Sequence, residues 1–150
     1  MSPVYVVTAA QAAARDARAI AAGTPSRELM QAAGRAAADE LLRHANARVA
    51  QGVDIYAGGG NNGGDGWVVA GILAAAGVPV RVHEIEPPRT PDASAEKADA
   101  AMVLQRAAPP RGRPGVVVDA LLGTGARGAP QGAIAQACGQ IEMARRDGAY

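Results

Sequence analysis

The chain has few of the features that mark secreted or membrane-anchored proteins. It contains one cysteine, Cys138, so no disulfide can form within the chain. No run of about 18 apolar residues is present, and charged residues interrupt the apolar pattern near the N-terminus, unlike in a signal peptide. We therefore expect a cytoplasmic protein with no membrane-spanning segment and a buried, inert thiol in a reducing compartment.

A clustered excess of basic residues is also missing. The formal net charge is +1, and the arginines are scattered, so we expect no nucleic-acid partner. Several catalytic signatures are absent as well: no Walker A lysine follows a glycine-rich segment, and there is no HExxH motif or Ser-His-Asp order. His44 and His83 lack the spacing of metal ligands.

What the chain does contain is the pattern of an α/β domain. Its 150 residues predict one domain over 1–150, large enough to bury a core. Two helices are expected first, one capped by Thr8 and Gln11 and ending near Gly23, the other starting around Thr24–Ser26 and fading near residue 44. Strands and helices then alternate, which predicts right-handed βαβ units and a parallel sheet. The expected strands are 53–57, 78–84 and 116–119, and the expected helices after the first two are 67–76, 93–107 and 131–146.

The segment 58–66 is the most unusual part of the sequence. It carries six glycines in nine positions, directly after the first strand and before the helix expected from Trp67. Backbone N–H groups at a helix N-terminus favour phosphate, so the segment predicts a nucleotide-like ligand. It also satisfies the dinucleotide fingerprint G-x-G-x-x-G, with Glu84 and Glu86 placed where a ribose-binding acid would stand.

The polar residues of this segment allow two interpretations each. Asn61 and Asn62 tolerate left-handed backbone, and an Asn amide can also give an oxygen ligand to a cation. Asp65 could cap the following helix, or it could hydrogen-bond a ribose or the nicotinamide side of a ligand. A carboxylate facing a phosphate would be repelled, so phosphate binding by Asp65 is disfavoured.

A second glycine-rich segment follows the third strand. Asp119 lies at the carboxyl end of this strand, where α/β enzymes place functional groups, and Gly123, Thr124 and Gly125 follow. An ordinary strand-to-helix loop would explain the same residues. If the strand order is 2-1-3, however, both glycine-rich segments face one crevice at the switch point of the sheet.

Four segments, taken together and in order, resemble the NAD(P)H-hydrate epimerase family (YjeF N-terminal domain). The resemblance covers nearly the whole chain, and Asn-Asn-Gly-Gly-Asp-Gly at 61–66 is its most specific part. The other three segments are 8–16, 26–34 (Ser-Arg-Glu-Leu-Met-Gln-Ala-Ala-Gly) and 118–125 (Val-Asp-Ala-Leu-Leu-Gly-Thr-Gly).

The resemblance implies a three-layer α/β/α Rossmann-like fold and an isomerase of cofactor repair. Such an enzyme interconverts the R and S forms of hydrated NAD(P)H, called NAD(P)HX, and binds a potassium ion, for which Asn62 and Asp119 would be ligands. The residues implied for the dinucleotide are Asn61, Asn62, Gly63, Gly64, Asp65, Gly123, Thr124, Gly125, Ala126, Arg127, Gly128 and Ala129.

The sequence departs from the family pattern at one point. The family's Asp-x-Pro-Ser-Gly segment, which supplies the catalytic Asp and a potassium-ligating Ser, is not present before Tyr150, so the catalytic residue is unknown. We therefore expect that a C-terminal part of the domain lies outside this sequence and that the chain alone has little epimerase activity. The resemblance also suggests a homodimer and a fused or separate ADP/ATP-dependent hydrate dehydratase.

Two other functions stay open on the sequence. One is a catalytically inactive domain that binds a dinucleotide or another protein. The other is a fragment of a Rossmann dehydrogenase, which Asn61-Asn62 and the second glycine-rich segment disfavour.

Overall fold

Three parallel strands form the single sheet of the computed structural model, which describes residues 6–150. The strands are β1 (Val53–Ala57), β2 (Val80–Glu84) and β3 (Val116–Ala120), in the order β2-β1-β3. Both outer strands pair with β1 in parallel, with Val53 opposite Val80 and Val116. This is the order 2-1-3 on which a shared crevice depends, and it brings the carboxyl ends of β1 and β3 side by side.

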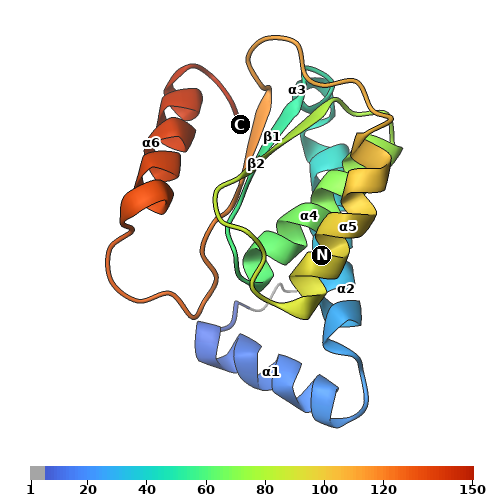
Figure 1. Cartoon of the computed structure of the whole chain (residues 1–150), viewed down its shortest axis with the longest axis vertical. Helices are drawn as coiled ribbons and strands as arrows, with labels where there is room; N and C mark the ends of the chain where they lie inside the picture. Colours follow the sequence, from blue (N-terminus) through green and yellow to red (C-terminus); the bar gives the residue numbers. More distant parts are fainter. Residues whose placement is uncertain (1–5) are drawn as a thin grey trace.

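Helices cover both faces of this sheet. Figure 1 shows α2, α4 and α5 on one face and α6 on the other, so the predicted three-layer α/β/α arrangement is confirmed. The helix α1 lies at the foot of the molecule, beneath the other layers. The helices are α1 (Ala9–Ala21), α2 (Ser26–His44), α3 (Asn46–Val49), α4 (Asn61–Ala75), α5 (Pro91–Leu104) and α6 (Gly132–Arg146).

The main core lies between the sheet and α4. Because side chains of a strand alternate between its two faces, Val53 and Ile55 of β1 point to the same side, where they pack with Val69 and Leu73 of α4. All five residues of β1 are buried, as expected for the central strand of a parallel sheet covered on both faces.

The opposite face of the sheet carries a buried acid. Asp54 of β1 is only 5% exposed, and its carboxylate contacts Arg81 Nη1 at 3.2 Å and His83 Nε2 at 2.9 Å. The His83 ring stacks on Tyr56, with the ring centroids 4.4 Å apart. A buried carboxylate needs such partners, so these contacts explain why polar residues occupy this side of β1 and β2.

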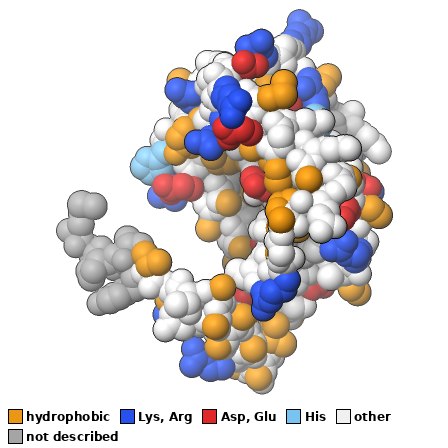
Figure 2. All heavy atoms as spheres, turned by 90° about the vertical axis from the view of Figure 1, so that its left-hand side faces the viewer, with side chains coloured by type: hydrophobic (Ala, Val, Ile, Leu, Met, Phe, Trp, Pro, Cys, Tyr) orange, Lys and Arg blue, Asp and Glu red, His pale blue; other side chains and the backbone are white. Residues whose placement is uncertain are grey.

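The helix α1 is well capped but contributes no buried side chain. Its predicted capping box is present: Gln11 N donates to Thr8 Oγ1 at 3.2 Å, and Thr8 N donates to Gln11 Oε1 at 2.8 Å. After the helix, Gly23 adopts a φ of 101°, a conformation that suits glycine. Figure 2 shows the α1 region at the bottom with apolar side chains on its surface. Ile20 of α1 is 47% exposed.

Several predicted boundaries differ from the structure: β2 begins at Val80 instead of 78, and α5 covers Pro91–Leu104 instead of 93–107. The short helix α3 follows α2 directly, where the sequence pattern had faded into a connector. The larger difference is α4, which begins at Asn61 instead of Trp67, so residues 61–66 form its first turns and only 58–60 form a loop. Glycine is a poor helix former, which is why the sequence predicted the later start.

Candidate functional site

The glycines before and within the first turns of α4 are places of close packing. A Cβ on Gly58 would lie 2.0 Å from the carbonyl oxygen of Leu121, and one on Gly63 would lie 1.8 Å from the carbonyl oxygen of Gly58. A Cβ on Gly66 would lie 2.7 Å from that of Ala120. These glycines therefore let α4 start directly against the ends of β1 and β3.

The helix α2 approaches α4 in the same way. A Cβ on Gly64 would lie 2.5 Å from Met30 Sδ, and one on Gly34 would lie 2.5 Å from the Cβ of Val68. Gly63 and Gly64, both implied as ligand residues, are buried, and protein atoms fill the space of their missing side chains. The composition of this segment is thus explained first by packing between helices and strands.

The two glycine-rich segments meet at the carboxyl ends of the neighbouring strands β1 and β3. Gly58 N donates to Ala120 O at 3.0 Å, and Asn62 Nδ2 donates to Leu122 O at 3.3 Å. A Cβ on Gly123 would lie 3.5 Å from the Cβ of Asn62, which is ordinary contact. The side chain of Asn62 therefore joins the start of α4 to the loop after β3.

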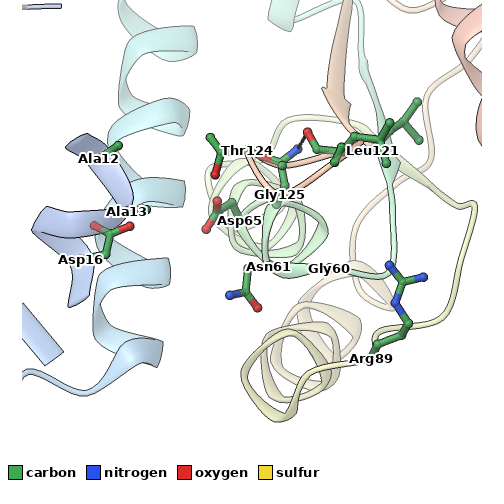
Figure 3. A pocket seen from close by; sticks show the side chains of 14 residues that line it. Ala12, Ala13, Asp16, Gly60, Asn61, Asp65, Arg89, Leu121, Thr124 and Gly125 are labelled. Carbon is green, nitrogen blue, oxygen red and sulfur yellow. Dashed lines mark hydrogen bonds between the residues drawn. The ribbon is translucent and has the colours of Figure 1, made fainter. Parts of the chain in front are cut away.

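A cavity of about 560 Å³ lies between these two segments and α1. Figure 3 shows α1 on one side of it and, on the other, the start of α4 with the loop after β3. Its volume falls in the range of small-molecule and cofactor sites. The residues that line it are Ala12, Ala13, Asp16, Gly60, Asn61, Asn62, Asp65, Arg89, Leu121, Leu122, Gly123, Thr124, Gly125 and Ala126.

The structure brings together seven of the residues implied for the dinucleotide. The other five do not line the cavity: Gly63 and Gly64 are buried in the helix packing, and 127–129 are exposed beyond it. Asp119 also lies outside the lining, exposed at the end of β3, where its Oδ1 accepts a hydrogen bond from Leu121 N at 3.0 Å. The seven that do line it are Asn61, Asn62, Asp65, Gly123, Thr124, Gly125 and Ala126.

Sequence reasoning missed the contribution of α1 and of the loop after β2. Ala12, Ala13 and Asp16 line the cavity from α1, and Arg89 lines it from the other side. Residues three or four apart share a face of a helix, so the spacing of Ala12, Ala13 and Asp16 could have grouped them. Nothing in the sequence indicated that this face would meet α4.

Asp65 points from α4 toward α1, and its environment disfavours the charged form. Burial, and secondarily the charge of Asp16, raise the pKa of Asp65 to about 6. The interpretation of Asp65 as the cap of the helix is wrong, because the N-cap residue is Gly60 and Asp65 lies one turn inside α4. Its carboxyl is therefore available to the cavity.

Arg89 holds its place beside the loop at 58–60. Its backbone N–H donates to Gly59 O at 2.8 Å, and its Nη1 donates to Glu86 Oε2 at 2.6 Å. Glu84 pairs with Lys97. Neither Glu84 nor Glu86 lines the cavity, so neither acid stands ready to bind a ribose there.

The oxygen atoms near the meeting point of the two segments are the candidate ligands for a cation. No group of three or more His, Cys, Asp or Glu side chains suited to a metal ion exists within residues 6–150. Asn62 uses its amide nitrogen for Leu122, and Asp119 uses one carboxylate oxygen for Leu121, while Asn62 Oδ1 and Asp119 Oδ2 make no hydrogen bond to the described residues 6–150. In this part of the chain, no helix is both long and apolar enough to cross a bilayer.

Comparison with known proteins places the chain in one family. Relatives include an NAD(P)H-hydrate epimerase of Limosilactobacillus reuteri, 37% identical over 79% of this chain and 58% of its own length. An NAD(P)H-hydrate epimerase of Pirellula staleyi is 40% identical over 71% of this chain and 52% of its own length. A bifunctional NAD(P)H-hydrate repair enzyme of Hyperthermus butylicus is 40% identical over 83% of this chain but 25% of its own.

Among solved structures, the fold matches the crystal structure of the yeast protein ynu0 (YNL200c). The TM-score is 0.79 at 20% sequence identity, over 95% of this chain and 67% of that one. The chain thus spans between a quarter and about three fifths of the curated relatives described above. Residues 26–147 match the family described as YjeF-related protein N-terminus. The chain belongs to this family.

Proposed function

We propose that this chain forms the dinucleotide-binding part of an NAD(P)H-hydrate epimerase. Such an isomerase interconverts the R and S forms of NADHX and NADPHX and so takes part in nicotinamide cofactor repair. One observation carries the proposal: Asn61, Asn62 and Asp65 line a single cavity together with the loop at 121–126. Family membership and the names of the relatives support the same activity.

Interconversion of the two epimers of the hydrate requires only a few functions of the protein. The hydroxylated carbon of the ring is bonded to the ring nitrogen, so the nitrogen lone pair can expel the hydroxyl group as water once it is protonated. The carbon that carried the hydroxyl is then trigonal and the ring is cationic, so water can return on the other face. The protein must hold this species, stabilise its charge and handle one proton.

The start of α4 provides the binding end of this scheme. The first N–H groups of a helix lack partners within the helix, and the helix dipole adds partial positive charge there. The first hydrogen bond of this helix runs from Gly64 N to Gly60 O at 3.1 Å, so the N–H groups of 61–63 have no partner within the helix, and Asn61 and Asn62 line the cavity. These groups suit the phosphates of a dinucleotide.

We propose a potassium ion beside this end. Asn62 Oδ1 and Asp119 Oδ2 are the proposed side-chain ligands, and both are hard donors of the kind that such cations prefer. When bound, the ion would supply positive charge near the phosphates.

Binding and epimer interconversion test the proposal directly. NADPHX is titrated into the chain in potassium and in sodium buffer, and interconversion of its epimers is followed by chromatography. We expect binding that is stronger in potassium, and Asp119→Ala should remove the difference between the two buffers. Asp39→Ala is the matched control, since Asp39 is an exposed aspartate of α2. If Asp119→Ala keeps the potassium response, the assignment of this ligand is wrong.

The outcome also separates the enzyme from a binding domain. Interconversion of the epimers supports the isomerase. Because the Asp-x-Pro-Ser-Gly segment is not present before Tyr150, the same assay is run on this chain joined to such a segment from a relative, where binding of NADPHX without interconversion supports an inactive dinucleotide-binding domain. Hydride transfer to or from ordinary NAD would instead support a dehydrogenase.

The proposed activity also has implications for the compartment and for a second enzyme. Cys138 is a free, half-buried thiol in α6, which suits a reducing compartment such as the cytoplasm. Bifunctional repair enzymes among the relatives combine two activities in one chain. We therefore propose that a hydrate dehydratase, fused or separate, acts on the same substrate pool.

A further inference from the structure

The charges that line the cavity are separated by sign. Only three of its lining residues are charged: Asp16, Asp65 and Arg89. Figure 3 shows Asp16 of α1 and Asp65 of α4 facing each other at one end, and Arg89 beside Gly60 at the other. The cavity therefore has one acidic end and one basic end.

The acidic end continues into a second, smaller space. A cavity of about 190 Å³ shares Asp16, Asn61 and Asp65 with the first, and its further charged lining residue is Asp92. Asp92 accepts a hydrogen bond from Ser26 Oγ at 2.5 Å, so that carboxylate has a partner. No lysine or arginine lines this second space, and the negative charge of Asp16 and Asp65 is not offset there.

The fold does not explain why Asp16 and Asp65 face each other. Two carboxylates without a cation between them repel, and this repulsion is one of the two causes that raise the pKa of Asp65. Within residues 6–150, Asp65 has neither a hydrogen bond nor an opposite charge that would favour its ionised form. A positive charge on a bound ligand would remove the repulsion.

The basic end has the opposite character. Arg89 lies against Gly59, where an added Cβ would be 3.2 Å from its guanidinium carbon, so the guanidinium sits next to the N-terminus of α4. A cation beside the positive end of a helix is unfavourable unless an anion joins them. Glu86 offsets part of this charge from outside the cavity, and a phosphate would offset it from within.

We propose that this separation of charge orients the ligand, with its phosphates between Arg89 and the start of α4 and its nicotinamide ring between Asp16 and Asp65. The inference rests on the proposed function. It assigns to Asp16 and Arg89 the role of specificity residues: the carboxylates favour a positively charged ring over a neutral one, and Arg89 holds the phosphate end. Ala12 and Ala13, beside Asp16, leave room for the ring.

Three stable ligands test the orientation without any need for catalysis. NADP⁺ has a cationic ring, NADPH has a neutral ring, and 2′-phospho-ADP-ribose has the same phosphates without a ring. Each is titrated calorimetrically into the chain at pH 8 and low ionic strength. We expect NADP⁺ to bind about tenfold more tightly than NADPH, a ratio typical of one favourable charge contact.

Single substitutions then separate the contributions of the acidic and basic ends of the cavity to binding. Asp16→Asn should lower the NADP⁺ to NADPH ratio, with Asp65 still present, and leave the affinity for 2′-phospho-ADP-ribose unchanged. Arg89→Gln should weaken all three ligands by a similar factor and keep the ratio. Asp39→Asn, on the exposed surface of α2, is the control with the same chemical change and should alter nothing.

The outcomes distinguish this inference from the proposed function. Equal affinity of the unaltered chain for NADP⁺ and NADPH overturns the orientation, as does a ratio that survives Asp16→Asn. Failure to bind any of the three ligands overturns the dinucleotide site itself. Asp16 is exposed on α1, so its substitution does not disturb the core, and the denaturation midpoint of each variant verifies this.

Discussion

The cavity has two helical walls, and they are built in opposite ways. The start of α4 is packed so closely that Gly63, Gly64 and Gly66 have no room for a side chain, whereas α1 buries no residue at all. The wall made by α4 is therefore fixed by the core, and the wall made by α1 is held by its cap and by the turn at Gly23. Residues of α1 can thus adapt to a ligand without disturbing the fold.

Among the substitutions that test this difference between the two walls, Gly63→Ala should lower the stability most. Its Cβ would lie 1.8 Å from a backbone oxygen, and neither α4 nor the loop at 58–60 can move without opening the sheet. We expect a loss of more than about 3 kcal/mol in the free energy of unfolding, at or above the upper range for overpacking. Urea denaturation of the purified variant measures it.

Gly139→Ala in α6 provides the matched control. A Cβ there meets nothing within 4 Å, and the residue is helical. Since alanine favours helix over glycine, this variant should be more stable by about 0.5–1 kcal/mol. Equal destabilisation by both substitutions would show that packing against 58–60 is not what selects Gly63.

A smaller effect is expected from the pH dependence of Asp65. Its pKa is 3.8 in the unfolded chain and about 6 in the folded one, so the folded state binds the proton more tightly. The free energy of unfolding should therefore fall as the pH rises from about 4 to about 6 and be unaffected by this group above that. Because Asp65 is only half-buried, screening limits the fall to about 1 kcal/mol.

Asp65→Asn should remove this fall. Urea midpoints measured from pH 4 to pH 8 should then show the variant more stable than the unaltered chain at pH 7, with the difference shrinking toward pH 4. Asp16→Asn should reduce the fall without abolishing it, since burial is the larger cause. Parallel pH profiles for all three proteins would contradict the assignment.

The smallest effect on global stability should come from Thr8→Ala. Loss of this N-cap weakens a helix by about 1 kcal/mol. Because α1 contributes nothing buried, the urea midpoint should hardly change, while amide hydrogen exchange in α1 should become faster. Unchanged exchange in α4 is the internal control, and a clear drop in the midpoint would show that α1 folds as part of the core.

Much of this fold is predictable because local patterns and the core agree. The bounds of β1 at 53–57, the capping box of Thr8 and the parallel pairing of the strands all follow from hydrophobic pattern, cap spacing and strand–helix alternation. The start of α4 is not predictable from propensity, because tight packing at Gly58, Gly63 and Gly66 overrides the poor helix propensity of glycine.

The residues of the site likewise fall into those that the sequence predicts and those that it does not. Asn61, Asn62 and Asp65 and the loop at 123–126 could be assigned because a motif carries them and the strand order brings them together. Asp16 and Arg89 could not, since each reaches the cavity only through the way α1 and the loop after β2 fold back on α4. Such placement depends on tertiary contacts that no short segment encodes.

The single tryptophan of the chain stands within the fixed wall. Trp67 is 6% exposed in α4, packs with Ala57 and Ala100, and has Lys97 Nζ 5.8 Å from its ring centroid. The helix α1 carries no aromatic side chain. Tryptophan fluorescence therefore reports selectively on α4: it changes when this helix melts and stays constant when α1 alone moves. A dye attached to α1 would report separately on the other side of the cavity.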